Sequence, residues 1–394
     1  MIRHAPSIGL GLGLSLRGSG VGFTGLLDLY GGAAAAYSLR ALSAGWVAGD
    51  VVEVRPSSGW TPASFTANQV ANGELVDYVK RPGAFTNSGF ETFVNNGTGD
   101  GFTATNTAVL GTATANLNAG VALDVVIVAF DLSIVSGSPT LSLRDGSSVA
   151  SNLETFTTSG SYSVTLTAAV AFDNFKFAEG DIPSEFTISN VRVSTNDGFV
   201  STWYDQSGNG NNATQITTTS QPKIVDAGSL VTGGLDFDGV DDVLNTSLVP
   251  PEIVTLIGVS VWDVEDETTM IVGARDSADK RSYLSQNTSG EIALGVGNSV
   301  LTSINVVAST NYLSFGMYSG SDRLLSVNGS PISDALGVAP TNTAHGYSIG
   351  ALNTAGVDSG FMNGTIAEVI VYDSNQSANR VGIETNINDA YSIY

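Results

Sequence analysis

The sequence contains no cysteine and only two histidines, His4 and His345, which lie far apart in the chain. Disulfide bonds and thiolate metal sites are therefore excluded, and a metal site built from several histidines is not expected. The stability of the fold must come from buried apolar area and from hydrogen bonds between strands.

Positive charge is also scarce, because 15 Lys and Arg residues stand against 37 Asp and Glu residues, for a net charge of -22. A surface of this sign repels nucleic acid and anionic membranes, so we expect no nucleic-acid partner. No run of about 18 apolar residues follows the N-terminal region, so no membrane insertion is expected. The acidic balance fits a role in solubility, the binding of divalent cations, or life in a saline medium.

Residues 1–22 form a Gly-rich arm that opens "MIRHAPSIGLGLGLSLRGSG". Its basic start and apolar stretch are also features of a signal peptide. However, glycine alternates with leucine, Arg17 interrupts the apolar stretch, and no clear cleavage site follows promptly. We expect an extended arm that docks on a partner particle.

The remainder of the chain consists of short β-branched runs separated by Gly, Asn, Ser and Asp, which predicts an all-β protein. Three segments are expected to be helical instead. Alanine-rich residues 33–44 carry a stripe of Tyr37, Leu39 and Leu42, and residues 66–80 predict a short helix or two turns. Near the C-terminus, one helical face carries Val381, Ile383, Ile387 and Tyr391, with Asp373 or Ser374 as the expected cap.

The residue pattern of the sequence is different between residues 89 and 195. Strand patterns such as "VALDVVIVAFDLSIVSG", "GSYSVTLTAAV" and "EFTISNVRVS" follow one another at regular short spacing. That pattern is typical of a β-sandwich module. The stretch "FVNNGTGDGFTATNT" at its start resembles the opening of jelly-roll carbohydrate-binding modules.

Two resemblances concern the rest of the chain. The segments "LDFDGVDD", "LSVNGSP" and "NGTIAEVIVYD" resemble the concanavalin-like (laminin-G-like) sandwich. The segments "LLDLYGGAAAAYSLRAL", "VVEVRPSS", "VSTWYDQSGNGNNATQ" and "IAEVIVYDSNQSANRVGIETNINDAY" are similar to the catalytic domain of fungal arabinofuranosidase B. They also resemble tailed-phage virion proteins that share that scaffold, and "GLGLGLSLRGSG" is similar to phage tail and fibre proteins.

These resemblances imply an all-β fold: a concanavalin/laminin-G-like β-sandwich (jelly roll) with an inserted second β-sandwich and a few short helices. They cover roughly the first 80 and the last 200 residues. We therefore expect an arm at 1–22, a discontinuous lectin-like sandwich at 23–88 plus 196–394, and an inserted carbohydrate-binding-module-like sandwich at 89–195. Insertion between neighbouring strand ends is sterically cheap.

Residues 203–215, "WYDQSGNGNNATQ", are a candidate glycan site. Aromatic rings can stack on a sugar, while amides and carboxylates bind its hydroxyl groups. The candidate residues are Trp203, Tyr204, Asp205, Gln206 and Asn211.

The same segment has a structural interpretation. Trp203 then ends a buried strand, Asp205 caps the following turn, and Gly208 and Gly210 supply positive φ angles. Turn chemistry by itself accounts for every residue type in the segment.

The motif "DFDGVDD" places four acids close together, and calcium prefers carboxylate and backbone oxygens as ligands. The candidate ligands are Asp236, Asp238, Asp241 and Asp242. The spacing is not that of the twelve-residue helix-loop-helix calcium loop, and a hairpin turn with Gly239 at its apex is the alternative. Calcium is the one cofactor that the sequence suggests.

Glycoside hydrolysis with retention would require two carboxyl groups about 5–5.5 Å apart. Glu368 and Asp205 are the catalytic candidates, and neither lies in a context that matches the family's catalytic acids. Glu368 lies between Ile366 and Ile370 on one strand face, which predicts partial burial and a raised pKa. A structural salt bridge is the alternative role for Glu368.

The function that these patterns favour is a structural protein of a phage virion, as a tail fibre, spike or head-surface protein. It would present lectin-like domains to a host cell-surface glycan, contact other virion proteins through residues 1–22, and form a homo-oligomer. Its expected location is the virion, after production in the bacterial cytoplasm. Two alternatives stay open: a glycoside hydrolase of arabinofuranosidase type, and a purely structural decoration or assembly protein.

Overall fold

The computed structural model describes residues 23–106, 111–116, 125–145, 152–167, 174–180, 183–265, 267–277, 280–336 and 345–394. The chain is nearly all β, with large antiparallel sheets and a few short helices, which confirms the predicted fold class. The predicted docking arm, residues 1–22, lies outside the described residues. None of the helices within them is both long enough and apolar enough to cross a membrane.

The central strand of the main body, which we define as the described residues outside 84–193, is β31 (Asn363–Tyr372). One edge of β31 pairs with β1 (Ala33–Ser38) and β18 (Leu235–Asp238), and the other edge pairs with β20 (Val254–Trp262). The sheet continues from β20 through β25 (Asn311–Tyr318) and β26 (Asp322–Val327) to β27 (Ser330–Ala335). Strands β20, β25 and β31 are buried on both faces, because successive side chains such as Val369 and Ile370 point into two different cores.

A second layer faces this sheet and is built from β21 (Thr269–Ser277), β22 (Lys280–Gln286), β23 (Glu291–Val296) and β24 (Ser299–Asn305). The short strands β28 (Ser348–Ile349), β29 (Leu352–Thr354) and β30 (Val357–Ser359) extend it beyond β21. Leu284 and Leu294 of this layer share one core with Leu256 and Leu325 of the other. The main body is therefore a β-sandwich.

A third group of strands surrounds β14 (Gly198–Trp203). It comprises β2 (Asp50–Pro56), β3 (Ala63–Thr66), β15 (Ala213–Thr214), β16 (Lys223–Asp226) and β17 (Ser229–Leu230), and β19 (Leu244–Asn245) links it to β28. The helices α2 (Ala67–Ala71) and α3 (Glu74–Val79) follow β3, as the sequence predicts for residues 66–80. Short 3-10 turns lie at Ala44–Trp46 and Thr218–Ser220.

The helix predicted over residues 33–44 is wrong, because residues 33–38 form strand β1. Ala35 and Ala36 are fully buried, and the strand pairs along its length with β31. Alanine favours a helix by only tenths of a kcal/mol per residue over most others. Pairing with a buried strand therefore outweighs local propensity.

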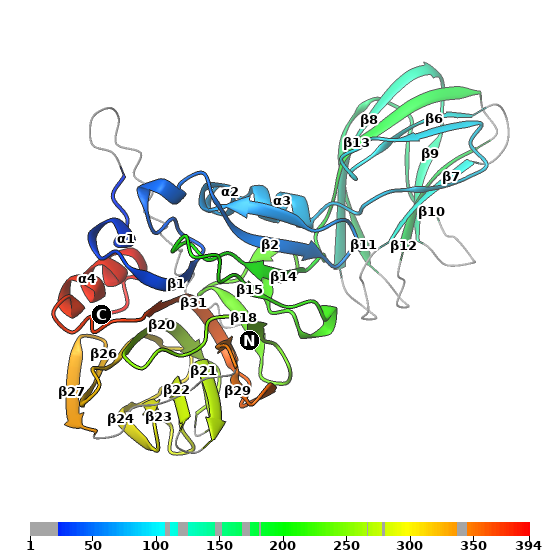
Figure 1. The fold of residues 1–394 in the computed structure, drawn as a ribbon. Coiled ribbons are helices and arrows are strands. Elements are labelled where there is room, and N and C mark those ends of the chain that lie inside the picture. The colour runs from blue at the N-terminus through cyan, green and yellow to red at the C-terminus, as the bar shows by residue number, and fades with distance from the viewer. Residues whose placement is uncertain are drawn as a thin grey trace.

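The C-terminal helix α4 (Arg380–Tyr391) is present as predicted and packs beside α1 (Leu26–Leu29), at the left of Figure 1. Ile383 and Ile387 are buried in the core beneath it. Val381, expected on the same face, is instead 64% exposed. The helix also starts later than expected, because its N-cap is Asn379 rather than Asp373 or Ser374.

Two further five-stranded sheets, within residues 86–193, form the inserted sandwich at the upper right of Figure 1. One sheet has the order β10 (Asn152–Phe156), β9 (Leu141–Asp145), β12 (Asn174–Glu179), β7 (Gly111–Asn116), β4 (Thr86–Ser88). The other has the order β11 (Gly160–Thr167), β8 (Val125–Gly137), β13 (Ser184–Val193), β6 (Phe102–Asn106), β5 (Thr92–Asn95). The expected boundary at residue 89 falls between β4 and β5, although both strands belong to this pair of sheets.

The inserted sandwich has a core of its own, rich in phenylalanine, that includes Phe85, Phe102, Phe175 and Phe177. The chain enters and leaves it at one place. The Val193 N–H donates to the Lys80 carbonyl at 2.8 Å, and Arg192 bridges Asp77 and Asp100. These contacts hold the two ends of the insert beside each other.

Candidate functional site

The segment "WYDQSGNGNNATQ" begins at the last residue of β14, where Trp203 is fully buried. The Trp203 ring packs against Tyr37, with 5.9 Å between ring centroids. A sugar cannot reach this ring. The prediction that Trp203 forms an exposed stacking platform is therefore wrong, because the β-strand alternation points it into the core.

Asp205 holds the loop that follows β14. Its Oδ1 accepts hydrogen bonds from the N–H groups of Ala36 and Ser207, both at 2.9 Å. Its Oδ2 accepts from the Ser207 hydroxyl and the Asn211 N–H, also at 2.9 Å. The carboxylate is only 1% exposed, so its hydrogen-bonding capacity serves the fold.

Gln206 fixes the chain that leaves β1. Its Nε2 donates to the carbonyl groups of Ser38 and Arg40, and its Oε1 accepts from the Leu42 N–H at 2.9 Å. The two amide atoms thus make three hydrogen bonds to backbone groups of residues 38–42. Residues 39–42 do not form a strand, so the Gln206 side chain binds backbone groups there that a neighbouring strand would otherwise bind.

The other expected glycan ligands also make structural contacts. Asn211 donates from Nδ2 to the Ala34 carbonyl at 2.9 Å, and its own carbonyl accepts from the Tyr37 hydroxyl. The Tyr204 hydroxyl bonds the Ser64 hydroxyl at 2.9 Å. The structural interpretation thus accounts for the segment, including the positive φ angles of 88° at Gly208 and 77° at Gly210.

Glu368 lies in β31 and is fully buried. Arg40 donates two hydrogen bonds to the Glu368 carboxylate, from Nε to Oε2 at 2.8 Å and from Nη2 to Oε1 at 3.0 Å. The hydroxyl groups of Ser38 and Tyr391 also donate to Oε2. This is the geometry of a structural ion pair, the alternative role considered for Glu368.

Burial and the neighbouring Glu368 carboxylate raise the pKa of the Tyr391 phenol well above its usual range. Tyr391 therefore stays protonated and donates at any physiological pH. The sequence could not show this cluster, because Ser38 and Arg40 lie about 330 residues before Glu368. The one local signal was a single arginine after an apolar segment, in "YSLRALSA".

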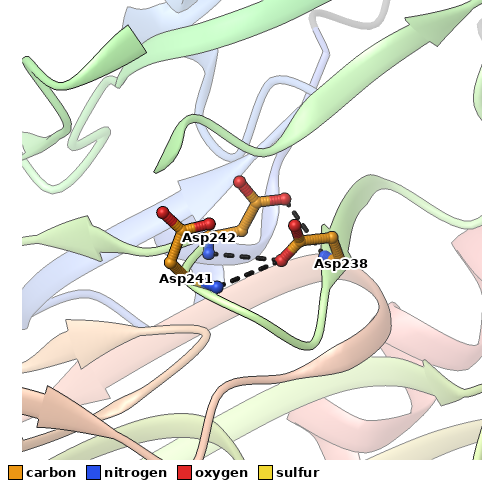
Figure 2. Close-up of side chains that lie close together, drawn as sticks. All are labelled: Asp238, Asp241 and Asp242. Atoms are coloured by element: carbon orange, nitrogen blue, oxygen red, sulfur yellow. Dashed lines mark hydrogen bonds between the residues drawn. The ribbon is translucent and has the colours of Figure 1, made fainter. Parts of the chain in front are cut away.

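The acidic turn, which we define as Asp238, Asp241 and Asp242, brings one carboxylate oxygen of each residue within 4.8 Å of the others (Figure 2). Asp238 Oδ1 accepts from the N–H groups of Val240 at 2.8 Å and Asp241 at 3.2 Å. Asp242 Oδ2 accepts from the Asp238 N–H at 3.1 Å. These bonds build the turn and leave an oxygen on each of these two carboxylates free of backbone bonds.

Burial, and then the nearby Asp238 carboxylate, raise the pKa of Asp242 to about 7. Asp236, the fourth expected ligand, lies outside the acidic turn. Burial and then Asp263 raise its pKa too. Calcium takes six to eight oxygens, so three carboxylates would need backbone or water oxygens as well. Calcium binding stays a prediction.

No protein-family model and no curated protein sequence matches this chain. Among solved structures, it is similar to the NanB sialidase from Streptococcus pneumoniae, at 16% identity and a TM-score of 0.29 over 34% of this chain and 24% of that one. It is also similar to the CBM40 of the Ruminococcus gnavus IT-sialidase bound to alpha2,3 sialyllactose, at 14% identity and a TM-score of 0.31 over 34% and 83%.

A third similar structure is the Trypanosoma rangeli sialidase in complex with sialic acid, at 10% identity and a TM-score of 0.35 over 75% and 62% of the two chains. The chain thus spans about a quarter of the length of the NanB sialidase. These neighbours are sialidases and a sialidase carbohydrate-binding module. Their TM-scores are too low for the likeness to assign a function to this chain.

Proposed function

We propose that this protein is a surface component of a phage particle that binds host glycan without cleaving it. Three observations support the proposal. The sequence resembles virion proteins built on a lectin-like scaffold, and the chain folds into two β-sandwich bodies with separate cores. The observation that carries the non-hydrolytic part is the environment of Glu368 and Asp205, whose carboxylates are both bonded within the fold.

Glycosidic cleavage needs one protonated and one ionised carboxyl group that both reach the sugar. The Glu368 carboxylate accepts hydrogen bonds from Arg40 and Tyr391, and these contacts keep a sugar from reaching it. Asp205 is closed off by the loop that it organises. Neither group is free to donate a proton to a leaving group, which supports binding over hydrolysis.

The test of the chemistry is incubation of the full chain with aryl-arabinofuranosides and with host surface polysaccharide. We expect binding on a glycan array and no turnover. Turnover that is lost in Glu368→Gln or in Asp205→Asn, with the fold intact, would make the hydrolase alternative correct. An array without any hit would instead favour the decoration or assembly protein.

The test of the location is mass spectrometry of purified phage particles. Within the arm, glycine and leucine alternate from Gly9 to Leu16. A glycine-rich strand of this kind specifies its pairing register poorly, so a partner that fixes the register suits it. We expect the full chain in the particle, and a chain lacking residues 2–20 to fold but stay out of it. Normal incorporation of the shortened chain would contradict the docking role of the arm.

A further inference from the structure

Two arginines stand directly opposite each other in the main body. Arg275 near the end of β21 pairs in register with Arg281 near the start of β22. Side chains at such positions lie on the same face of the sheet, with Cβ atoms about 4.5–5.5 Å apart. Two like charges at this spacing repel, so the pair opposes the stability of the hairpin that carries it.

Among the residues that the structure describes, neither arginine has an acid as its ion-pair partner. Across the described ranges, no carboxylate forms an ion pair with Arg275 or Arg281, and the Nε atom of each is buried without a hydrogen-bond partner. Arg40, Arg323 and Arg380 of the same body each contact a carboxylate. Among the described residues, two neighbouring arginines without an acidic partner are therefore an exception, and a bound anion would supply such a partner.

The neighbouring residues lie on the face of the second layer that points away from the shared core, where Tyr283 is buried with Met270 and Leu352. Tyr283 follows Arg281 on the same face, and the Arg281 Cζ lies 5.6 Å from the Tyr283 ring centroid. The ring lies over Gly295 of β23, where an added Cβ would come within 2.1 Å of the ring carbon Cζ. On the other side of Arg275, β29 places Thr354 next to it in register.

We propose that Arg275 and Arg281 together bind an oxyanion, the carboxylate or sulfate group of an acidic sugar. Guanidinium groups present planar pairs of donors that match a carboxylate or a sulfate oxygen pair. A bound anion would offset the repulsion between the two arginines. The sugar part of this inference rests on the proposed glycan binding, whereas the anion part rests on the arginines alone.

The net charge of the protein restricts the class of anion that can bind to these arginines. The net charge of -22 repels a long polyanion such as nucleic acid. A saccharide with isolated anionic groups carries too little charge for that repulsion to dominate. The hydroxyl of Thr354, beside Arg275, is a neutral group of the kind that binds sugar hydroxyls.

The first experiment tests the anion site with sodium sulfate and sodium acetate at constant ionic strength, read as thermal unfolding midpoints. The variants are Arg275→Gln and Arg281→Gln. Arg55→Gln is the matched control, because it removes the same charge from an arginine that bonds Gln221 and the Thr218 carbonyl instead of an acid. Sulfate stabilises all variants slightly through exclusion from the surface, so the difference between variants is the measurement.

We expect a saturable increase of the midpoint in the unchanged protein and in Arg55→Gln, and its loss in both other variants. Without anion, Arg275→Gln and Arg281→Gln should be at least as stable as the unchanged protein, since each relieves repulsion. An equal anion response in all four proteins would overturn the proposal. A clear loss of stability without anion, in either arginine variant, would also overturn it, because the pair would then be structural.

The second experiment uses calorimetric titration with three matched oligosaccharides, one neutral, one carrying a uronic acid and one sulfated. We expect an acidic sugar to bind, and each arginine variant to weaken its binding by about tenfold or more, the effect of losing a charged hydrogen bond. If inorganic anions bind and all oligosaccharides fail, the glycan function fails while the anion site stands. If neutral sugar binds all variants equally and acidic sugar gains nothing, the inference fails while the glycan function stands.

Discussion

Asp242 has a carboxyl group whose pKa is raised to about 7, so its charge changes near neutral pH. Its folded-state pKa of about 7 lies above the unfolded value of 3.8, so the folded chain holds this proton more tightly. The tighter proton binding adds to the free energy of unfolding. This contribution is fully present below pH 3.8 and is lost as the pH rises through about 7. Asp242 therefore opposes folding at pH 8.

We predict that Asp242→Asn removes this loss. At pH 8 the variant should be more stable than the unchanged protein by about 2 kcal/mol, a value reduced from the full shift to allow for solvent screening. At pH 4 the two should be nearly equal. Urea unfolding across pH 4–8 measures the difference, and a difference that does not change with pH would contradict the assignment.

Without a cation, ionisation of Asp242 lowers the stability of the fold. With calcium bound at the acidic turn, ionisation would instead raise the stability, because a bound cation favours the ionised carboxylates. We predict that calcium raises the unfolding temperature at pH 8 and that Asp238→Asn reduces the rise. Asp236→Asn is the matched control, since Asp236 lies outside the acidic turn. The same response in both variants, or none in the unchanged protein, would exclude a calcium site at this turn.

At the scale of elements, β1 depends on the loop after β14. β1 pairs with β31 on one side, and on its other side the loop supplies side chains in place of a strand. Asp205 accepts from the Ala36 N–H, and Gln206 and Asn211 bond the carbonyl groups of Ser38 and Ala34. The loop therefore completes the hydrogen bonding of a buried strand.

We predict that Asp205→Ala destabilises the protein by about 2–4 kcal/mol, because it leaves buried N–H groups without acceptors. Hydrogen exchange at the Ala36 amide should accelerate, whereas exchange in the inserted sandwich should not change. Asn209→Ala is the control, because Asn209 is exposed and its bonds to Ala33 and Ala34 lie near the surface. Equal losses in the two variants would mean that the carboxylate has no special role.

At the scale of the whole molecule, the chain is a main body interrupted by the inserted sandwich (Figure 1). The last residue of the insert, Val193, is hydrogen-bonded to Lys80, just before the insert, and Arg192 ties β13 to Asp77 of α3. Trp60 of the main body lies against Gly99 of the insert, where an added Cβ would come within 2.6 Å of the indole. The junction is thus small and near the ends of the insert.

We predict that residues 84–194 expressed alone unfold in a single cooperative transition, because their phenylalanine core is complete within the segment. A main body in which a short Gly–Ser linker replaces that segment should fold as well. Circular dichroism during urea unfolding and dispersion of amide signals in NMR spectra measure both. A molten fragment would show that the insert needs the main body.

The residue pattern by itself determined the elements whose signal is local. Alternating apolar residues predicted most strands, and Ile383 and Ile387 predicted the buried face of α4. The turn residues of "WYDQSGNGNNATQ" also carry their structure locally, through glycine and short polar side chains. Hydrophobic periodicity and turn chemistry act over a few residues, which is why they can be interpreted without the fold.

Only the tertiary structure decided the features that depend on distant partners. Residues 33–38 are a strand because β31, more than 320 residues later, offers them a buried edge. Glu368 is a structural group because Arg40 reaches it, and Arg275 and Arg281 become a pair only when β21 and β22 align. The physical reason is the same in each case: pairing and charge contacts are set by distance in space, which local sequence does not contain.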